Sequence, residues 1–149
     1  METWMITGVT GFLGPRVEVT LRQKGEVEVL PMTREELNFT DEEQVKRVLG
    51  MLHPDVLVHA AAVSDTGACE RDPEGSWKVN VTGVEYLSKA CRENGTKLIF
   101  ASSDQVYTGS EVRTPHREDE ILTPANVYGR EKLEAERIVA NWCPEGVSL

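Results

Sequence analysis

The sequence predicts an α/β domain in which a parallel sheet is covered by helices on both faces, a three-layer α/β/α arrangement. Short apolar runs alternate along the chain with longer segments of helical character. A glycine-rich turn separates the first apolar run from the first helical segment. This alternation favours a doubly wound sheet, because strand–helix–strand units place their strands parallel through right-handed crossovers. The 149 residues are enough for one domain with a core.

The first predicted unit surrounds the glycine turn. Thr3 to Thr7 forms a short apolar strand that ends at the turn. Residues 13–24 have the character of a helix, which Gly25 closes. Residues 26–30 alternate charged and apolar side chains, as a half-buried strand does. The order strand, turn, helix and strand predicts the first parallel pair of the sheet.

The middle of the chain continues the alternation. The Thr-Asp pair at 40–41 is suited to cap a helix over residues 42–52, because its side-chain oxygens can accept from free N–H groups. The apolar residues 55–60 indicate a buried third strand. A long helical stretch is predicted from about residue 74 to residue 94, where Gly95 ends it.

The last third of the chain predicts one further strand and helix, and the start of a fifth strand. Residues 97–102 form the fourth apolar run, and a polar, proline-bearing loop follows over residues 105–124. A helix is predicted over residues 126–142, with apolar side chains near one face. Residues 147–149 have the character of a strand that begins after a proline and a glycine.

The glycine turn has the spacing Gly8-x-x-Gly11-x-x-Gly14 between a strand and a helix, the context that gives this motif meaning. The first glycine permits a tight turn, the second lets the backbone approach a pyrophosphate, and the third lets helix and strand pack closely. The N–H groups of Phe12 and Leu13 would meet the anion at the positive end of the helix dipole. The turn predicts a Rossmann-type dinucleotide site, although three glycines also occur in ordinary strand-to-helix turns.

The end of the second strand favours a phosphorylated dinucleotide. A carboxylate there would bind the ribose hydroxyls of NAD and repel the 2′-phosphate of NADP. The chain instead reads Leu-Pro-Met-Thr-Arg over residues 30–34. Because Thr33 does not repel a phosphate and Arg34 could pair with it, we predict that NADP(H) is favoured over NAD(H). The alternative for Arg34 is a solvated loop arginine.

Tyr128 and Lys132 are four residues apart in the last predicted helix, which places both side chains on one face. A lysine ammonium beside a phenol favours the phenolate, so Lys132 is expected to lower the pKa of Tyr128. A proton donor beside a hydride carrier is the minimum equipment for reducing a carbonyl. Taken alone, the pair also fits a half-buried aromatic and a surface lysine paired with Glu136.

Residues at other strand ends support the catalytic interpretation. Ser102 and Ser103 end the fourth strand, where parallel sheets place their ligands. Asn80 lies in the long predicted helix, where an amide is useful only if it finds a partner. His59 is interpreted as a packed strand-end histidine rather than a base. It precedes three small residues that would let a cofactor lie against the backbone, or that simply pack closely: Ala60, Ala61 and Ala62.

Charge and cysteine content exclude several classes of function. The net charge of −9 argues against nucleic acid or an anionic membrane as a partner, because both require a basic face. Three cysteines without C-x-x-C spacing fit reduced thiols in a cytoplasm better than a disulfide framework or a zinc site. No apolar run is long enough to span a bilayer. We predict a cytoplasmic protein without a metal site.

The motifs together resemble the extended short-chain dehydrogenases/reductases and, more narrowly, the dTDP-4-dehydrorhamnose reductase family. The matching segments span nearly the whole chain: TGVTGFLG (7–14), LNFTD (37–41), HPDVLVHAAA (53–62), VNVTG (79–83), SSDQVYTG (102–109) and REDEILTPANVYGREKLEAE (117–136). The resemblance implies an NADP-binding Rossmann domain over residues 1–149, and a C-terminal substrate domain of the family that is absent from this chain.

The resemblance also implies the roles of individual residues. It implies a catalytic triad of Ser103, Tyr128 and Lys132, with Lys132 also touching the nicotinamide ribose. It implies pyrophosphate contacts at Gly8, Gly11, Phe12, Leu13 and Gly14. It places Ala60, Ala61 and Ala62 along the cofactor, and Asn38 and Phe39 near the adenine. Asn38, Gln105 and His116 replace residues usual in the family. These differences weaken the inference about which sugar is bound more than the inference about the type of reaction.

The activity that the resemblance implies is NADP(H)-dependent reduction of a 4-keto-6-deoxysugar nucleotide. Whether the protein forms a homodimer stays open at this point. A second interpretation is a non-catalytic regulatory protein, similar to the regulatory subunit of methionine adenosyltransferase, which has a comparable domain and retains the triad. A nucleotide-sugar epimerase or dehydratase is a third. The motifs alone do not separate these three functions.

Overall fold

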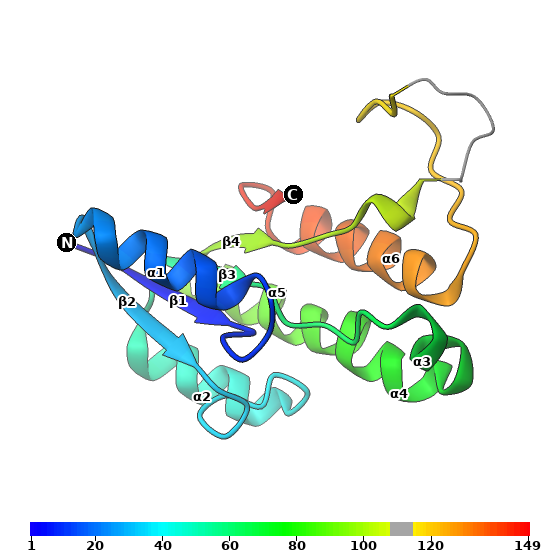
Figure 1. Ribbon diagram of the computed structural model, residues 1–149. Coiled ribbons are helices and arrows are strands. Elements are labelled where there is room, and N and C mark those ends of the chain that lie inside the picture. Colours follow the sequence, from blue (N-terminus) through cyan, green and yellow to red (C-terminus); the bar gives the residue numbers. More distant parts are fainter. Residues whose placement is uncertain (108–114) are drawn as a thin grey trace.

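The computed structural model describes residues 1–107 and 115–149, so the predicted loop over residues 105–124 and the matching segment 102–109 lie partly outside the described residues. Within the described residues, five strands form one sheet in the order β2-β1-β3-β4-β5, and every pairing is parallel (Figure 1). The strands are β1 (Glu2–Thr7), β2 (Val27–Met32), β3 (Val56–His59), β4 (Lys97–Phe100) and β5 (Val147–Ser148). The main helices are α1 (Gly14–Lys24), α2 (Glu42–Leu52), α5 (Gly83–Asn94) and α6 (Val127–Trp142).

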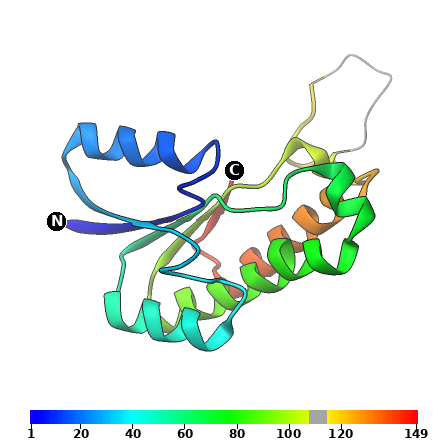
Figure 2. The same ribbon diagram turned by 60° about the horizontal axis from the view of Figure 1, so that its bottom comes forward.

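The helices cover both faces of the sheet. Figure 2 shows α1 on one face and α2, α5 and α6 on the other, which confirms the Rossmann-type doubly wound fold with three layers. β1 is an interior strand, and β3 occupies the middle position. Because β2 and β3 lie on opposite sides of β1, the chain reverses its direction across the sheet here. The carboxyl ends of β1 and β3 therefore form a topological switch point, where parallel sheets bind ligands.

The core has two parts because the sheet is buried on both faces. Successive strand residues point to opposite sides. β1 therefore contributes Met5 to a larger cluster under α2, α5 and α6, and Ile6 to a smaller cluster under α1. The larger cluster also contains Leu57, Leu87, Leu98 and Phe100. Burial of these apolar side chains holds the strand ends in fixed positions, and the candidate site lies at those ends.

The stretch predicted as a helix from residue 74 to 94 is helical throughout, with a π-helical turn, η1 (Lys78–Thr82), between α4 (Pro73–Trp77) and α5. A separate short helix, α3 (Thr66–Arg71), precedes it. Asp65 and Asp72 cap α3 and α4 by accepting hydrogen bonds from the N–H groups of Ala68 and Gly75. α3 is too short to show a helical period in the sequence. π-helical turns are frequent at functional sites, and η1 contains Asn80.

The second strand is longer than predicted. β2 pairs with β1 as far as Met32 and includes Pro31, opposite Ile6. Proline has no N–H to donate, but β2 is the edge strand of the described sheet and needs donors on one side only. The extension brings Thr33 and Arg34 to the same edge of the sheet as the glycine turn.

Three observations bear on other classes of function. Cys69, Cys91 and Cys143 are buried free thiols, and burial raises the pKa of each. Across residues 1–107 and 115–149, no group of His, Cys, Asp and Glu side chains is arranged to hold a metal ion. No helix in the same part of the chain is both long and apolar enough to cross a membrane.

Candidate active site

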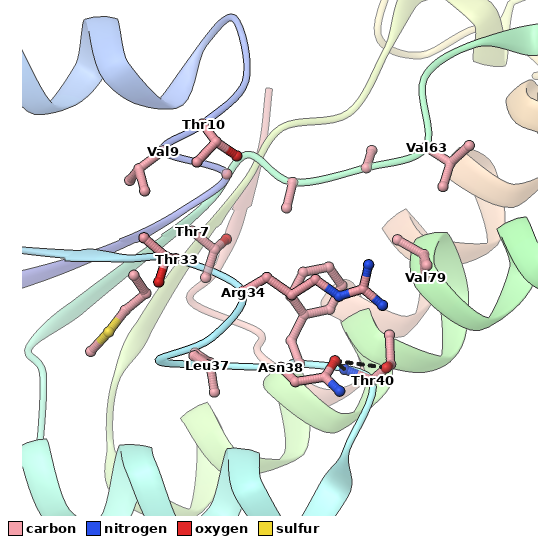
Figure 3. Close-up of a pocket in the computed structure, with 15 residues that line it drawn as sticks. Thr7, Val9, Thr10, Thr33, Arg34, Leu37, Asn38, Thr40, Val63 and Val79 are labelled. Atoms are coloured by element: carbon pink, nitrogen blue, oxygen red, sulfur yellow. Dashed lines mark hydrogen bonds between the residues drawn. The ribbon is translucent and has the colours of Figure 1, made fainter.

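Two adjoining cavities form a trough along the carboxyl ends of the strands. Their volumes are about 250 and 320 Å³, and both are lined by Gly8, Thr10, Ala61 and Ala62. The first (Figure 3) is lined by the predicted adenine-side residues Thr33, Arg34, Asn38 and Phe39. The second is lined by the predicted residues Gly11, Phe12, Leu13, Ala60, Tyr128 and Lys132. Gly14 and Ser103 do not line this trough: Gly14 is buried behind the turn, and Ser103 lines a neighbouring cavity.

The glycine turn packs tightly against the end of β3. Gly8 has a φ of 79°, and a Cβ on it would lie 2.6 Å from the carbonyl carbon of Ala60. A Cβ on Gly14 would overlap the carbonyl oxygen of Gly8. The backbone therefore requires glycine at both positions. In the described part of the chain, the N–H groups of Phe12 and Leu13 have no acceptor, and they lie at the N-terminus of α1. This cradle fits the pyrophosphate of a dinucleotide.

The turn after β2 contains a carboxylate that the sequence analysis missed. Glu36 folds back on Thr33, and its Oε2 accepts hydrogen bonds of 2.8 Å from both the N–H and the hydroxyl of Thr33. These hydrogen bonds lower the pKa of Glu36. Arg34 has no hydrogen-bond or ion-pair partner among the described residues, and Figure 3 shows its side chain extending across the pocket toward Val79. Asn38 holds the same loop by accepting from the N–H and hydroxyl of Thr40.

His59 lies beneath the trough as a packed, neutral side chain, which agrees with its interpretation from the sequence. Its ring is edge-on to Phe39, with 4.8 Å between ring centroids, and stacks with Phe100. Nδ1 lies 2.7 Å from the hydroxyl of Thr7, whereas the buried Nε2 has no partner in the described part of the chain. Burial, followed by the charge of Lys132, lowers the pKa of His59 to about 3, so the doubly protonated, charged ring is strongly disfavoured.

Tyr128 and Lys132 are held in the first two turns of α6. The N-cap Asn126 accepts from the N–H of Gly129, and a Cβ on Gly129 would overlap the carbonyl oxygen of Gln105, so the start of the helix is locked against the loop after β4. Tyr128 and Lys132 are only 7% and 3% exposed. The Lys132 ammonium donates to the carbonyl of Ala101 (2.8 Å) and lies 5.8 Å from the centroid of the Tyr128 ring. Both side chains therefore face one wall of the trough.

The expected lowering of the Tyr128 pKa by Lys132 is not present in this structure. Burial raises the pKa of Tyr128, and a hydrogen bond with Ser103 opposes that shift only in part. The Lys132 ammonium is directed to a backbone carbonyl rather than to the phenol. Burial also lowers the pKa of Lys132, to about 8, although Glu136 and Glu131 oppose this shift. The phenol is thus protonated at neutral pH, the state that a proton donor requires.

The two serines after β4 have different environments. Ser103 caps the short helix η2 (Asp104–Val106), where its hydroxyl accepts from the N–H of Gln105 at 3.2 Å. It also contacts the phenol of Tyr128. The Ser102 hydroxyl donates to Glu136 and lines the trough. Ser103 is therefore the serine that can share a substrate oxygen with Tyr128.

A buried carboxylate, Glu131, connects α6 to the π-helical turn. It is 1% exposed, and it accepts hydrogen bonds from Ser76 (2.5 Å) and Asn80 (2.7 Å). Asn80 also donates to the carbonyl of Val63 and accepts from its N–H, which fixes the chain just after the three alanines that follow β3. Asn80 thus has the partner that the sequence analysis required. Glu131 was missed because its partners Ser76 and Asn80 lie 55 and 51 residues away in the chain, so no local pattern shows the contact.

Comparison with known proteins identifies the family. The sequence profile described as "RmlD substrate binding domain" matches residues 2–148. The chain belongs to the RmlD substrate-binding-domain family. It is 31% identical, over its full length and 50% of the relative, to a dTDP-4-dehydrorhamnose reductase of Aggregatibacter actinomycetemcomitans. It is 37% identical, over 91% of the chain and 42% of the relative, to methionine adenosyltransferase 2 subunit beta of Xenopus laevis.

The solved structures of RmlD-type proteins show the same fold. The dTDP-4-dehydrorhamnose reductase of Bacillus anthracis, solved in complex with NADP, superposes with a TM-score of 0.93 at 26% identity. The match covers 99% of this chain and 52% of that structure. The chain therefore spans about half the length of the RmlD-family proteins it matches.

Proposed function

We propose that the protein is an NADP(H)-dependent reductase of a 4-keto-6-deoxysugar nucleotide, and that residues 1–149 form its cofactor-binding Rossmann domain. The observation that carries this proposal is the shared trough. The glycine cradle, a free arginine at the end of β2, and the Tyr128–Lys132 pair all face it. The named relatives supply the substrate class, a dTDP-linked keto-deoxysugar.

The geometry supports a different role for each of the three proposed catalytic residues. A bound nicotinamide cofactor supplies the hydride. Tyr128, kept protonated by burial, donates its proton to the substrate carbonyl oxygen, and Ser103 donates a hydrogen bond to the same oxygen. Lys132 is already anchored at Ala101; it is placed to bind the nicotinamide ribose and to stabilise the phenolate that remains after proton transfer.

Within this proposal, NADP(H) is preferred to NAD(H) because Arg34 has a guanidinium free to pair with a 2′-phosphate. The NADP complex of the Bacillus anthracis relative supports binding of the phosphorylated cofactor. One charge-assisted contact is worth about 1.5–3 kcal/mol, so the expected preference is on the order of ten- to hundredfold.

The second candidate is a non-catalytic regulatory protein, favoured by the likeness to a methionine adenosyltransferase subunit. A nucleotide-sugar epimerase or dehydratase is a third. Dehydratases would be supported by acidic residues after Ser103; Asp104 supplies one, whereas Gln105 does not.

One experiment separates these functions. The complete protein is supplied with NADPH and a dTDP-4-keto-6-deoxysugar, and oxidation of NADPH is followed by absorbance. Oxidation that depends on the sugar supports the reductase. Tight cofactor binding without turnover of any keto-sugar nucleotide, together with co-purification of an adenosyltransferase, would instead establish the regulatory role.

A further inference from the structure

The turn after β2 has the geometry of an anion site that is filled by the protein's own carboxylate. The Thr33 N–H and hydroxyl both donate to Oε2 of Glu36, at 2.8 Å each. The turn is closed further by the Leu37 N–H, which donates to the carbonyl of Thr33 at 3.0 Å. Thr33 lines the first cavity, whereas Glu36 is exposed beside it. Two donors converging on one oxygen are the arrangement that a phosphate oxygen would also use.

Glu36 and Arg34 act in opposite directions on a phosphate at this place. Arg34 lines the same cavity, and no ion pair joins it to Glu36 in the described part of the chain. A 2′-phosphate would be attracted by the free guanidinium. It would also be repelled by the carboxylate, and it would gain the Thr33 donors only after Glu36 had released them. A ribose 2′-hydroxyl, by contrast, can donate to the carboxylate as it stands.

We propose that Glu36 is a specificity-determining residue that competes with the 2′-phosphate of NADP(H) for the donors of Thr33 and thereby limits the preference for NADP(H) set by Arg34. This inference rests on the proposed cofactor site and deepens it. It assigns the role of the ribose-binding carboxylate to Glu36. Glu36 lies three residues beyond Thr33, outside the position at the end of β2 where the sequence pattern would place such a carboxylate. The protein would accordingly bind both cofactors, and Glu36 would set the ratio of their dissociation constants.

The test uses two ligands that differ only in the 2′-phosphate, namely 2′,5′-ADP and 5′-AMP, with NADPH and NADH as the full cofactors. Dissociation constants are measured by calorimetry on the complete protein and on Glu36→Gln. The substitution should tighten the binding of 2′,5′-ADP by about three- to tenfold and leave the binding of 5′-AMP unchanged or weaker, because a neutral amide neither repels the phosphate nor competes strongly for the Thr33 donors.

Glu35→Gln is the matched control. It removes the same charge from the neighbouring exposed residue, which makes no hydrogen bond to Thr33. An equal change in the dissociation constant of 2′,5′-ADP in Glu35→Gln and Glu36→Gln would show that net charge alone causes the effect, and would overturn the proposal. Glu36→Ala serves in the same way if Glu36→Gln does not fold, and thermal unfolding of each variant verifies folding.

The outcomes also separate this inference from the proposed function. Binding of both 2′,5′-ADP and 5′-AMP with an unchanged ratio of dissociation constants in the Glu36 variants would overturn the role of Glu36 and leave the cofactor site standing. Failure of the folded wild-type protein to bind NADPH, NADH, 2′,5′-ADP or 5′-AMP would overturn the cofactor site itself, and this inference with it.

Discussion

The two ends of the trough differ in burial. At the proposed catalytic end, Tyr128, Glu131 and Lys132 are nearly inaccessible, and hydrogen bonds tie Glu131 and Lys132 to neighbouring elements. At the nucleotide end, Arg34 and Glu36 are exposed on a loop. Interactions of charged groups are strong where water is excluded and weak where it is not. We therefore expect substitutions at the catalytic end to change chemistry and stability together, and those at the nucleotide end to change binding alone.

Lys132→Met is expected to have a large effect on both turnover and cofactor binding. This substitution removes the ammonium that is proposed to bind the nicotinamide ribose and to stabilise the phenolate. Turnover should fall by about 10²-fold or more, and cofactor affinity should fall as well, by about tenfold. Steady-state NADPH oxidation and cofactor titration on the same preparation measure both quantities. A variant that loses turnover but binds cofactor normally would refute the ribose contact.

Glu131→Ala should show that the buried network stabilises the catalytic end. The substitution leaves the buried donors of Ser76 and Asn80 without their acceptor, and the free energy of unfolding should fall by about 3 kcal/mol. Chemical denaturation measures this change. Glu134→Ala is the control on the same helix; it breaks only a surface pair with Arg137 and should change the free energy of unfolding by less than about 0.5 kcal/mol. Equal effects of the two substitutions would contradict the account.

Arg34→Ala tests the exposed end. It should weaken binding of NADPH by about tenfold, leave NADH binding unchanged, and leave the unfolding midpoint within experimental error. Titration of both cofactors against the wild type and the variant gives the ratio directly. A stronger response to NADH than to NADPH in the wild type, or equal weakening of both in the variant, would show that Arg34 does not select the phosphate.

The smallest effect concerns pH. Burial lowers the pKa of Lys132 to about 8 from an ordinary 10.5. Between these values the unfolded chain binds more protons than the folded chain, so the cost of the buried charge is relieved as pH rises. Relative to Lys132→Met, the free energy of unfolding of the wild type should rise by about 1 kcal/mol between about pH 7.5 and 9. Chemical denaturation of both proteins at the two pH values measures this change. A difference in the free energy of unfolding between wild type and Lys132→Met that does not change with pH would contradict the buried charge.

The parts of the fold that could be predicted are those with a local signal. The helix over 42–52 has its cap in Asp41, and the spacing of Gly8 and Gly14 describes a turn whose backbone excludes a Cβ. The helical stretch over 74–94 was predicted as well, whereas the π-helical turn inside it was not, because that turn does not break the apolar pattern. Asp65 was a signal for α3 that the sequence analysis did not use.

Features of the site that depend on tertiary contact could not be predicted. Glu36 reaches Thr33 only because the loop turns back, and Glu131 meets Ser76 across a long separation in the chain. The predicted direction of the Tyr128 pKa shift was also wrong, because burial of the phenol, which the sequence spacing does not show, raises that pKa. The spacing of Tyr128 and Lys132 predicts a shared face, whereas the depth of that face is set by the elements packed around it.

The most direct test of the account is Tyr128→Phe in the complete protein. The change removes one hydroxyl from a buried side chain and leaves the cradle, Arg34 and Lys132 in place. We predict that the dissociation constant for NADPH stays within about twofold of the wild-type value, and that turnover of a dTDP-4-keto-6-deoxysugar falls by about 10²–10⁴-fold. Normal turnover in Tyr128→Phe would show that another group donates the proton, and would contradict the central claim drawn from the Tyr128–Lys132 pair.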